Sequence, residues 1–503
     1  MSRKLPKANE AMALVRPLPR AQDPLALYAL LSESGRRPDT LLLERTVGPT
    51  LLVDRAAVRV ECRGQSVTLT ALSENGRNLL GGEGAQTLSF ERSASLDAAE
   101  RLRAPSPLDA LRSLTTAIAS LTPEEPFTLA CGGVVAYDHV DLFEALPASA
   151  EDPLGFPDFL FWIADSLIVF EAGARPRAIC TAFGSDDPGE TQRAYFGASQ
   201  RLADLVERCE RTAPDVEAPA PATPDFAATD LDDAGYEAVV ALMKTHIAAG
   251  EVYQIVPSRT FRAPCADPIR AFAGARRLDP SPYQFFVAGP DHILFGASPE
   301  TSVRVFRDGV TKVEVKPIAG TRPRGATPDE DDRMEAELRL DHKEAAEHMM
   351  LVDLARNDVA RVSVTGTRRV AKLLTAERYA RVMHLVSSVT GELRPDLDAL
   401  HTLQACLNVG TLTGAPKIRA TELLRQTERT RRGPYGGAVG WINGEGLMDL
   451  GVVIRSAVVK DGTAFVRAGA GVVHDSDPRS EADETKRKAS AILSVLAGAG
   501  VAA

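Results

Sequence analysis

Two pairs of glutamates have the spacing of neighbours on one helix face. Glu344 and Glu347 lie in "HKEAAEHMM", and Glu481 and Glu484 lie in "SEADETKRKA". Residues three apart share a helix face, and two helices each offering a carboxylate could hold Mg²⁺, which binds few protein carboxylates and keeps other positions for water or ligand oxygens. Spacing alone favours the simpler interpretation of solvated acids or acids that complement a helix dipole. Whether the pairs meet in space does not follow from it.

A second stretch, "KPIAGTRPRG" (316–325), has the composition of an anion-binding segment. Gly320 lets the backbone approach a ligand closely, and Thr321 adds a hydroxyl. Arg322 and Arg324 carry planar guanidinium groups suited to carboxylates. The centre of the stretch, Ala319, carries only a methyl group, so no reactive side chain stands there.

Three further features could bind an anion. The "AGAG" stretch with Gly469, Ala470 and Gly471 could present backbone N–H groups, although a tight turn at a strand end is an equal interpretation. Arg455 interrupts the apolar run "GVVIRSAVV" and must be paired if it is buried, either with a ligand carboxylate or within the chain. Lys417 in "GTLTGAPK" opens a helix but lacks Walker A spacing, which disfavours nucleotide hydrolysis.

The elements that would position these residues are mixed strands and helices without regular βαβ alternation, which indicates an α+β fold. Alternating apolar residues predict antiparallel strands over 40–72. Helices are expected over 105–121, 234–251, 329–358 (broken once) and 480–500, and the stretch containing His384 is taken as an apolar helix. The Pro- and Ala-rich segment 211–233 is predicted to be a linker between residues 1–210 and 234–497.

Composition indicates a soluble globular protein. Of the 503 residues, 44% are apolar and 25% charged, which is typical of folded domains. The net charge of −10 argues against nucleic acid as a partner. Six scattered cysteines fit free thiols in a reducing compartment. The start lacks the apolar stretch of a secretory signal, and no run approaches the ~20 residues of a membrane helix, so we expect a cytoplasmic location.

Taken together, these motifs resemble the family of anthranilate synthase component I, among the chorismate-utilising enzymes. The resemblance covers essentially all of residues 235–495 and is specific; the N-terminal half is similar more loosely, through "LLLER" and "VAYD". It rests on "YQIVPSR", "DPSPYQFF", "PIAGTRPRG", "DHKEAAEHMMLVDLARND", "VMHLVSSVTGEL", "GTLTGAPK", "RRGPYGGAVGW", "VIRSA" and "RAGAGVVHDSDPRSEADET". It implies a large antiparallel β-sheet sandwich flanked by helices, with an N-terminal regulatory segment packed against the catalytic part.

The resemblance also implies a reaction, in which chorismate and ammonia give anthranilate and pyruvate through aminodeoxyisochorismate. Glu347 and Glu484 then correspond to the Mg²⁺ ligands. Glu300 of "ASPE" would be the general acid for the departing C4 hydroxyl, and His384 would assist pyruvate elimination. The chorismate contacts carried over are Gly320, Thr321 (also placed with the catalytic residues), Tyr435, Arg455, Gly469, Ala470 and Gly471.

Two absent lysines separate this activity from related ones. Relatives that attack with water carry a lysine where this chain has Gln254, and aminodeoxychorismate synthase carries one at the position of Ala319. A nucleophilic lysine would be needed for a covalent step, whereas ammonia needs mainly positioning. Alternatives left open are an enzyme that stops at aminodeoxyisochorismate, an isochorismate or aminodeoxychorismate synthase, and an inactive binding regulator.

The family resemblance implies a partner and a regulatory site. The chain lacks the nucleophile-elbow cysteine of a glutamine amidotransferase, so a separate amidotransferase subunit is expected, in an assembly with two copies of each chain. The tryptophan site would include Arg45, Pro282, Tyr283 and Gln284. Arg45 replaces the serine of the family's "LLES", and Asp279 and Gln284 depart from "NPSPYM". We therefore expect weak or absent tryptophan inhibition, as in an enzyme that supplies a specialised pathway.

Overall fold

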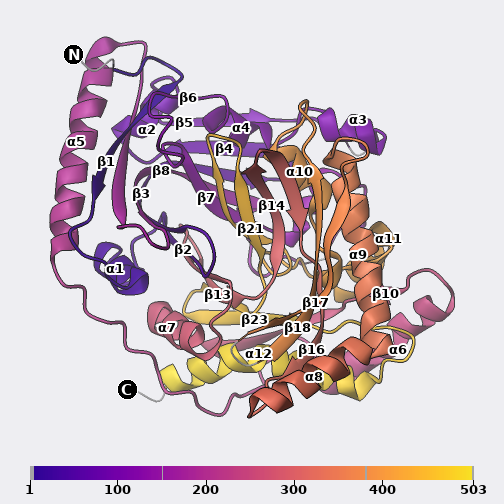
Figure 1. Ribbon diagram of the computed structural model, residues 1–503. Helices are drawn as coiled ribbons and strands as arrows, with labels where there is room; N and C mark the ends of the chain where they lie inside the picture. Colours follow the sequence, from indigo (N-terminus) through magenta and orange to yellow (C-terminus); the bar gives the residue numbers. More distant parts are fainter. Residues whose placement is uncertain (1–4, 94, 150, 380–381, 501–503) are drawn as a thin grey trace.

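A large antiparallel sheet system forms the centre of the computed structural model, and helices cover its outer faces (Figure 1). The structure describes residues 5–93, 95–149, 151–379 and 382–500. Within them, neighbouring strands pair antiparallel except for β1 and β6, which are parallel, and β10 pairs only with β19. The expectation of a large antiparallel sheet flanked by helices is therefore confirmed.

The strands before the expected linker are β1 (Glu10–Pro17), β2 (Thr40–Arg45), β3 (Thr50–Arg63), β4 (Ser66–Ala71), β5 (Ala85–Ser89), β6 (Ala119–Ser120), β7 (Ala130–Val135), β8 (Phe159–Phe170) and β9 (Arg177–Phe183). Those after it are β10 (Gln254–Ile255), β11 (Ser258–Pro264), β12 (Tyr283–Ala288), β13 (Ile293–Ser298), β14 (Thr301–Asp308), β15 (Val310–Val315), β16 (Ile318–Pro323), β17 (Arg369–Arg378), β18 (Val382–Glu392), β19 (Gly414–Ala415), β20 (Ala438–Asn443), β21 (Met448–Val452), β22 (Ser456–Lys460) and β23 (Thr463–Gly469).

The helices are α1 (Pro24–Leu31), α2 (Glu74–Leu79), α3 (Ala98–Arg103), α4 (Asp109–Leu114), α5 (Pro188–Glu210), α6 (Asp233–Ala248), α7 (Pro268–Leu278), α8 (Pro328–Leu340), α9 (His342–Val362), α10 (Ala399–Cys406), α11 (Lys417–Glu428) and α12 (Pro478–Gly500), with short 3₁₀ turns at Tyr137–Leu142 and Gly410–Leu412. Most begin at an aspartate, serine or threonine whose side chain accepts a backbone N–H of the first turn, as in α6, where Asp232 accepts from Gly235.

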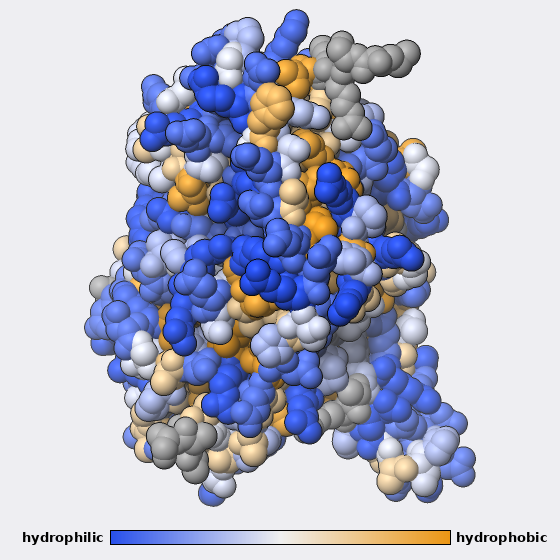
Figure 2. Space-filling view, turned by 90° about the vertical axis from the view of Figure 1, so that its left-hand side faces the viewer, coloured by the Kyte–Doolittle hydropathy of each residue, from blue (hydrophilic) through white to orange (hydrophobic). Residues whose placement is uncertain are grey.

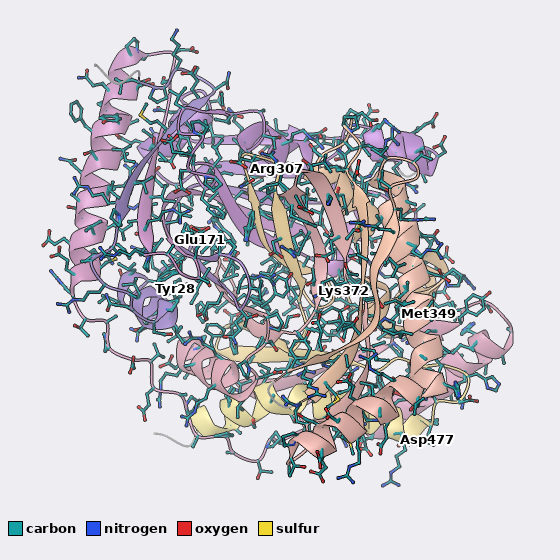
Figure 3. The ribbon with its side chains drawn as sticks, viewed as in Figure 1. Tyr28, Glu171, Arg307, Met349, Lys372 and Asp477 are labelled. Carbon is teal, nitrogen blue, oxygen red and sulfur yellow. The ribbon has the colours of Figure 1, made fainter. Side chains whose placement is uncertain are left out.

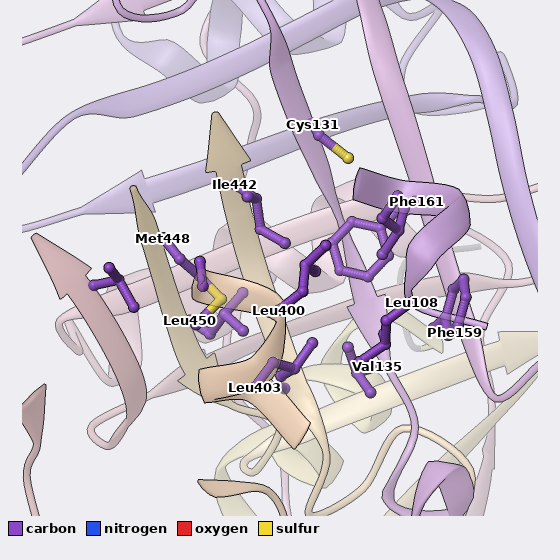
Figure 4. Close-up of a cluster of buried hydrophobic side chains, with 14 of the residues drawn as sticks. Leu108, Cys131, Val135, Phe159, Phe161, Leu400, Leu403, Ile442, Met448 and Leu450 are labelled. Carbon is purple, nitrogen blue, oxygen red and sulfur yellow. The ribbon is translucent and has the colours of Figure 1, made fainter. Parts of the chain in front are cut away.

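The central strands are buried on both faces, because successive side chains of a strand point in opposite directions. In β8, Leu160 and Trp162 pack into an apolar cluster with side chains of β2, β3 and β12. Their neighbours Phe159 and Phe161 face a second cluster under α4 and α10. Figure 4 shows this second cluster, in which Leu400 of α10 meets strand side chains including Phe161. A third cluster lies under α1, α5, α7 and α12.

Strands from both halves of the chain belong to one sheet system. β2 pairs with β12, so that Arg45 is opposite Tyr283, and β7 pairs with β20. The segment proposed as a linker, 211–233, has no helix or strand until α6 begins at Asp233. The proposed segments 1–210 and 234–497 are therefore joined side by side by backbone hydrogen bonds between their strands.

Two expected helices were wrong in type or extent. The stretch 382–393, taken as a helix, forms strand β18 instead, and its β-branched residues pair with β15, β16 and β17. The helix expected over 105–121 is reduced to α4, because the chain then enters β6 beside β1. The break expected within 329–358 is confirmed at Asp341, which separates α8 from α9 and caps α9.

The surface agrees with the composition. The face in Figure 2 is mainly hydrophilic, with hydrophobic side chains gathered near its middle. Among the described residues, no helix is both long enough and apolar enough to cross a bilayer. The six cysteines are all free and buried.

Candidate active site

The pairing of β16 with β18 brings Thr321 and His384 opposite each other. Nδ1 of His384 lies 3.0 Å from the carbonyl oxygen of Gly320 and 3.1 Å from Oγ1 of Thr321. A carbonyl only accepts, so Nδ1 carries the proton and donates it to Gly320, which leaves a lone pair on Nε2. Nε2 is buried and has no partner within the described residues.

Burial also keeps this imidazole neutral. Desolvation lowers the pKa of His384, the hydrogen bond to Gly320 opposes that change, and the positive charge of Arg455 adds to it. A neutral histidine with a free, buried Nε2 can accept a proton from a substrate held beside it.

Gly320 is required by the shape of the β16 edge. The register slips by one residue between Ala319 and Thr321, and Gly320 has φ +72°. A Cβ atom at this position would lie 3.0 Å from Leu338 and 3.2 Å from Oε2 of Glu344. The bulge therefore brings the backbone against α8 and α9, where only glycine fits.

Glu300 is a buried carboxyl between β13 and β14. Burial raises its pKa to about 7, the hydroxyl of Thr411 opposes that shift by donating to Oε1 at 2.6 Å, and the charge of Lys488 opposes it further. Near neutral pH the group is therefore partly protonated and able to donate a proton. Thr411 comes from the "GTLTGAPK" stretch, which gives that motif a role in this site.

The four helix carboxylates lie within electrostatic reach of one another. Burial raises the pKa of Glu347 to about 7, Lys343 opposes this, and Glu344, Glu481 and Glu484 add to it. Glu347 belongs to α9 and the last two to α12. Figure 3 shows Met349 of α9 and Asp477, just before α12, on the same side of the molecule. The structure thus places the two pairs, which spacing alone could not relate, within electrostatic range of each other.

Lys488 joins α12 to the rest of the site. Its Nζ donates to Oε1 of Glu484 at 2.8 Å and to the carbonyl of Gly469 at 3.0 Å. Burial raises the pKa of Glu484, but the charge and hydrogen bond of Lys488, together with the charges of Arg487 and Lys343, outweigh burial, and the net shift is downward. The sequence had not pointed to Lys488, although it stands four residues after Glu484 on the same helix face.

These carboxylates suit a hard cation such as Mg²⁺ by their donor chemistry. Mg²⁺ needs only one or two protein carboxylates, and a cation would relieve the repulsion that helps raise the pKa of Glu347. Within the described ranges, no group of three or more His, Cys, Asp or Glu is assembled as a complete metal site. The remaining ligands would have to be water or substrate oxygens.

The "AGAG" stretch forms a crowded turn at the end of β23. A Cβ atom on Gly469 would lie 2.6 Å from the carbonyl of Pro257, and one on Gly471 would lie 2.8 Å from Nε2 of Gln254. The N–H of Ala470 is directed to the hydroxyl of Tyr236, at 3.2 Å. Of the three residues, Gly471 is thus the best placed to offer its N–H to a ligand.

Tyr435 lies against this turn. Its hydroxyl would be 3.1 Å from a Cβ on Gly469 and is hydrogen-bonded to the backbone of that residue. Burial raises the pKa of Tyr435 to about 12, so it stays protonated. The neighbouring Arg432 pairs with buried Glu428, which fixes the segment that carries Tyr435.

The cations singled out from sequence already have partners in the chain. Arg322 pairs with Asp341, and Arg324 pairs with Asp331. Arg455 pairs with Asp279, the internal salt bridge that was one of its two interpretations. Lys417 donates to Asp358 at 2.8 Å, so its ammonium holds α11 to α9.

The positions without lysine lie at the same site. Gln254 is buried in β10 beside Gly471, and its Oε1 has no partner in the described part of the chain. Ala319 lies on β16, next to Gly320. Neither side chain can act as a general base or form a covalent bond to a substrate.

Arg45, Pro282, Tyr283 and Gln284 lie together at the β2–β12 pair. The guanidinium carbon of Arg45 stands 3.5 Å from the centre of the Tyr283 ring, and its Nη2 is 3.1 Å from Oδ2 of Asp449. The Tyr283 hydroxyl donates to the same carboxylate at 2.8 Å. Arg45 therefore occupies the space over the ring.

A cavity of about 520 Å³ adjoins this cluster. Its lining residues are Pro24, Glu44, Arg45, Thr46, Thr50, Ala273, Arg276, Arg277, Pro280, Ser281 and Gln284. Burial raises the pKa of Glu44 to about 7 against the opposing charge of Arg276. The cavity is separate from the cluster of Glu300, His384 and the helix carboxylates, none of which lines it.

Comparison with known proteins adds three findings. The sequence profile of the chorismate binding enzymes matches residues 71–494. The chain is 44% identical to anthranilate synthase component 1 of Vibrio cholerae, over 95% of each chain. It is 45% identical to the pyocyanine-specific anthranilate synthase component 1 of Pseudomonas aeruginosa, over 88% of this chain and 86% of the relative.

The fold is similar to a solved structure as well. The crystal structure of anthranilate synthase component I from Streptococcus pneumoniae superposes with a TM-score of 0.73 and 30% identity, covering 90% of this chain and 93% of the other.

Proposed function

Because this chain belongs to the chorismate binding enzyme family, we propose that it is the large, aminating component of an anthranilate synthase. It converts chorismate and ammonia to anthranilate and pyruvate. The observation that carries this proposal is the identity of 44% to a component 1 protein over 95% of both chains. The chemistry of the buried Glu300 and His384 supports it independently.

Substrate carboxylates would be bound by backbone and cationic groups around Glu300 and His384. The candidates are Gly320, Thr321, Tyr435, Arg455 and the turn Gly469–Ala470–Gly471. Thr321 also hydrogen-bonds His384, so its hydroxyl can link substrate binding to the orientation of the imidazole. Arg455 supplies a planar guanidinium group suited to a carboxylate.

The first step is addition of ammonia at C2 with loss of the C4 hydroxyl. The C4–O bond breaks, and Glu300 gives the departing oxygen its proton, so that water leaves. A carboxyl whose pKa is about 7 is partly protonated at neutral pH and can give up that proton. Ammonia brings its own nucleophilic lone pair, which fits a pocket with Gln254 and Ala319 in place of lysines.

The second step releases pyruvate. A base takes the proton from C2 while the C3–O bond breaks, the ring becomes aromatic, and the departing enolpyruvate gains a proton at its methylene carbon to become pyruvate. Nε2 of His384 is the free basic atom for this transfer, since Nδ1 is committed to Gly320. This assignment favours the complete reaction over an enzyme that stops at aminodeoxyisochorismate.

We assign Glu347 and Glu484 as the protein ligands of Mg²⁺, with Glu344 and Glu481 nearby. When bound, the ion would neutralise the ring carboxylate of chorismate and withdraw charge from it. The carboxylates of α9 and α12 would otherwise repel a dianionic substrate.

Ammonia would come from a separate glutamine amidotransferase subunit, since the names of the relatives refer to one component of a synthase. We propose a heterotetramer with two copies of each chain, located in the cytoplasm, where six free thiols remain reduced.

Feedback control by tryptophan would be weakened in this chain. Arg45 covers the ring of Tyr283 and is tied to Asp449, so an indole or an ammonium group would have to displace a paired cation. Displacing it would leave Asp449 buried with less compensation. Such an enzyme would suit a specialised pathway, in which anthranilate is needed when tryptophan is plentiful.

Anthranilate fluorescence tests the proposed function. Purified protein with chorismate, Mg²⁺ and an ammonium salt should produce anthranilate and an equal amount of pyruvate, and EDTA should stop both. A preparation that consumes chorismate without aromatic product and pyruvate would contradict the proposal. Substituting His384→Ala should cut pyruvate release about 100-fold, with accumulation of the aminated intermediate measured by chromatography.

A further inference from the structure

Arg455 is held by an aspartate from a distant part of the chain. Its Nη1 donates to Oδ2 of Asp279, the residue that follows α7. Both side chains are about one-quarter exposed, at 29% for Arg455 and 25% for Asp279. The pair therefore faces a partly solvated space rather than the apolar core.

The carboxylate of Asp279 is itself fixed on the other side. Its Oδ1 accepts the hydroxyl of Ser281 at 3.1 Å, and its backbone N–H donates to Ala275 in the last turn of α7. The backbone of Arg455 is also constrained, with φ +47° and its carbonyl accepting the N–H of Ala297 at 3.1 Å. A left-handed arginine persists only where the surroundings hold it.

The pair lies close enough to the proposed base for its charges to act on it. His384 senses the positive charge of Arg455 and the negative charge of Asp279, with opposite effects. One arginine atom, Nη1, is used by Asp279. The remaining donors, on Nε and Nη2, form a second edge that can bind a carboxylate in bidentate fashion.

We propose that Asp279 is a positioning residue for substrate binding, which holds Nη1 of Arg455 so that the other edge of the guanidinium receives a chorismate carboxylate. This inference rests on the proposed function. Without Asp279, a long, partly exposed arginine would sample several rotamers, and binding would have to order it. The aspartate also reduces the net positive charge that the dianion meets, so its benefit is in geometry.

The test compares Asp279→Ala and Asp279→Asn with Asp267→Ala. Asp267 caps the other end of α7, whereas within the described residues Arg455 forms its salt bridge with Asp279, so Asp267→Ala controls for loss of helix stability. Chorismate affinity is measured by calorimetry with Mg²⁺ and without ammonium or glutamine, and KM and kcat are measured with saturating ammonium.

Asp279→Ala should weaken chorismate binding and raise KM about threefold to tenfold, with kcat within about twofold of wild type. Asp279→Asn keeps a hydrogen-bond acceptor, so its chorismate affinity should lie between those of Asp279→Ala and wild type. Asp267→Ala should bind chorismate like wild type. In the background of Arg455→Lys, which lacks the planar second edge, Asp279→Ala should add less than twofold.

Unchanged affinity in Asp279→Ala, the same loss in Asp267→Ala, a change in kcat alone, or full additivity with Arg455→Lys would each overturn the inference. Failure of the wild-type protein to form anthranilate would instead contradict the proposed function. The two failures are therefore distinguishable.

Discussion

At the scale of single residues, burial moves two titratable side chains in opposite and complementary ways. It raises the pKa of Glu300 to about 7 and lowers the pKa of His384. Near pH 7, Glu300 is therefore partly protonated and can act as an acid, while His384 is neutral and can act as a base. Pairs of groups whose environments separate their protonation states in this way are typical of acid–base catalysis.

The pH dependence of turnover should report Glu300. The acid must be protonated to act, so kcat should fall as pH rises through about 7. Glu300→Gln cannot donate this proton and should lose about 10²- to 10⁴-fold in kcat. Thr411→Val removes the hydrogen bond that lowers the pKa of Glu300, so the alkaline limb should move to higher pH.

Initial rates of anthranilate formation between about pH 6 and about pH 9, at saturating chorismate and ammonia, measure these effects. An alkaline limb that stays in place in Thr411→Val, or a Glu300→Gln enzyme near wild-type rate, would assign the acid to another group. Thermal unfolding of both variants checks that the fold is retained.

At the scale of elements, α9 and α12 bring like charges together, and a cation should compensate them. The folded-state pKa of Glu347 is raised to about 7 from an ordinary value of 4.5. The contribution of Glu347 to the free energy of unfolding is fully present below its unfolded-state pKa of 4.5 and is lost as pH rises through about 7. At pH 8 without Mg²⁺, Glu347→Gln should therefore be more stable than wild type, by about 1–3 kcal/mol.

The same substitution should remove the stabilisation that Mg²⁺ gives. Melting temperatures with and without millimolar Mg²⁺ measure this in wild type, in Glu347→Gln and in Glu337→Gln, an acid-to-amide control on α8. Wild type and the control should melt higher with Mg²⁺, and Glu347→Gln should not. An equal Mg²⁺ response in all three proteins would exclude Glu347 as a ligand.

The position of Arg45 at the β2–β12 pair leads to a prediction about inhibition by tryptophan. Arg45→Ser would uncover the ring of Tyr283 and remove one cation from Asp449. Tryptophan should then inhibit anthranilate formation at a concentration at least about tenfold lower than in wild type, equivalent to roughly 1.4 kcal/mol. Arg16→Ser, an exposed strand arginine, is the control. Submillimolar inhibition of the wild type would contradict the role given to Arg45.

Sequence reasoning was sound where a local rule decides the structure and failed where tertiary pairing does. The single break expected within 329–358 falls at Asp341, whose side chain caps α9. The stretch with His384 was expected to be a helix but forms strand β18. A short apolar run is compatible with either element, and here its pairing with β16 decides for the strand. The salt bridge of Arg455 could not be chosen over a ligand, because Asp279 is 176 residues away.

At the scale of the whole molecule, the two halves of the chain share one sheet system. β2 carries Arg45 to β12, and β7 runs beside β20. The strand β12 that bears Tyr283 pairs in turn with β13, whose end leads to Glu300. The Arg45 cluster is therefore joined to the segment that carries Glu300 through two hydrogen-bonded strand pairs, β2–β12 and β12–β13.

The complete assembly should differ from the isolated chain in its pH profile. With an ammonium salt, the supply of free NH₃ grows as pH rises, while the protonated fraction of Glu300 shrinks above about 7. At an ammonium concentration far below saturation, these opposing trends should leave the rate level or rising above pH 7, unlike kcat at saturating NH₃. With the amidotransferase subunit and glutamine, ammonia is delivered already deprotonated, so only the loss of the Glu300 proton remains and the rate should fall. If the pH profiles measured with ammonium and with glutamine are superimposable, ammonia supply and Glu300 protonation do not control the rate as argued. Another step, common to both reactions, would then be rate-limiting.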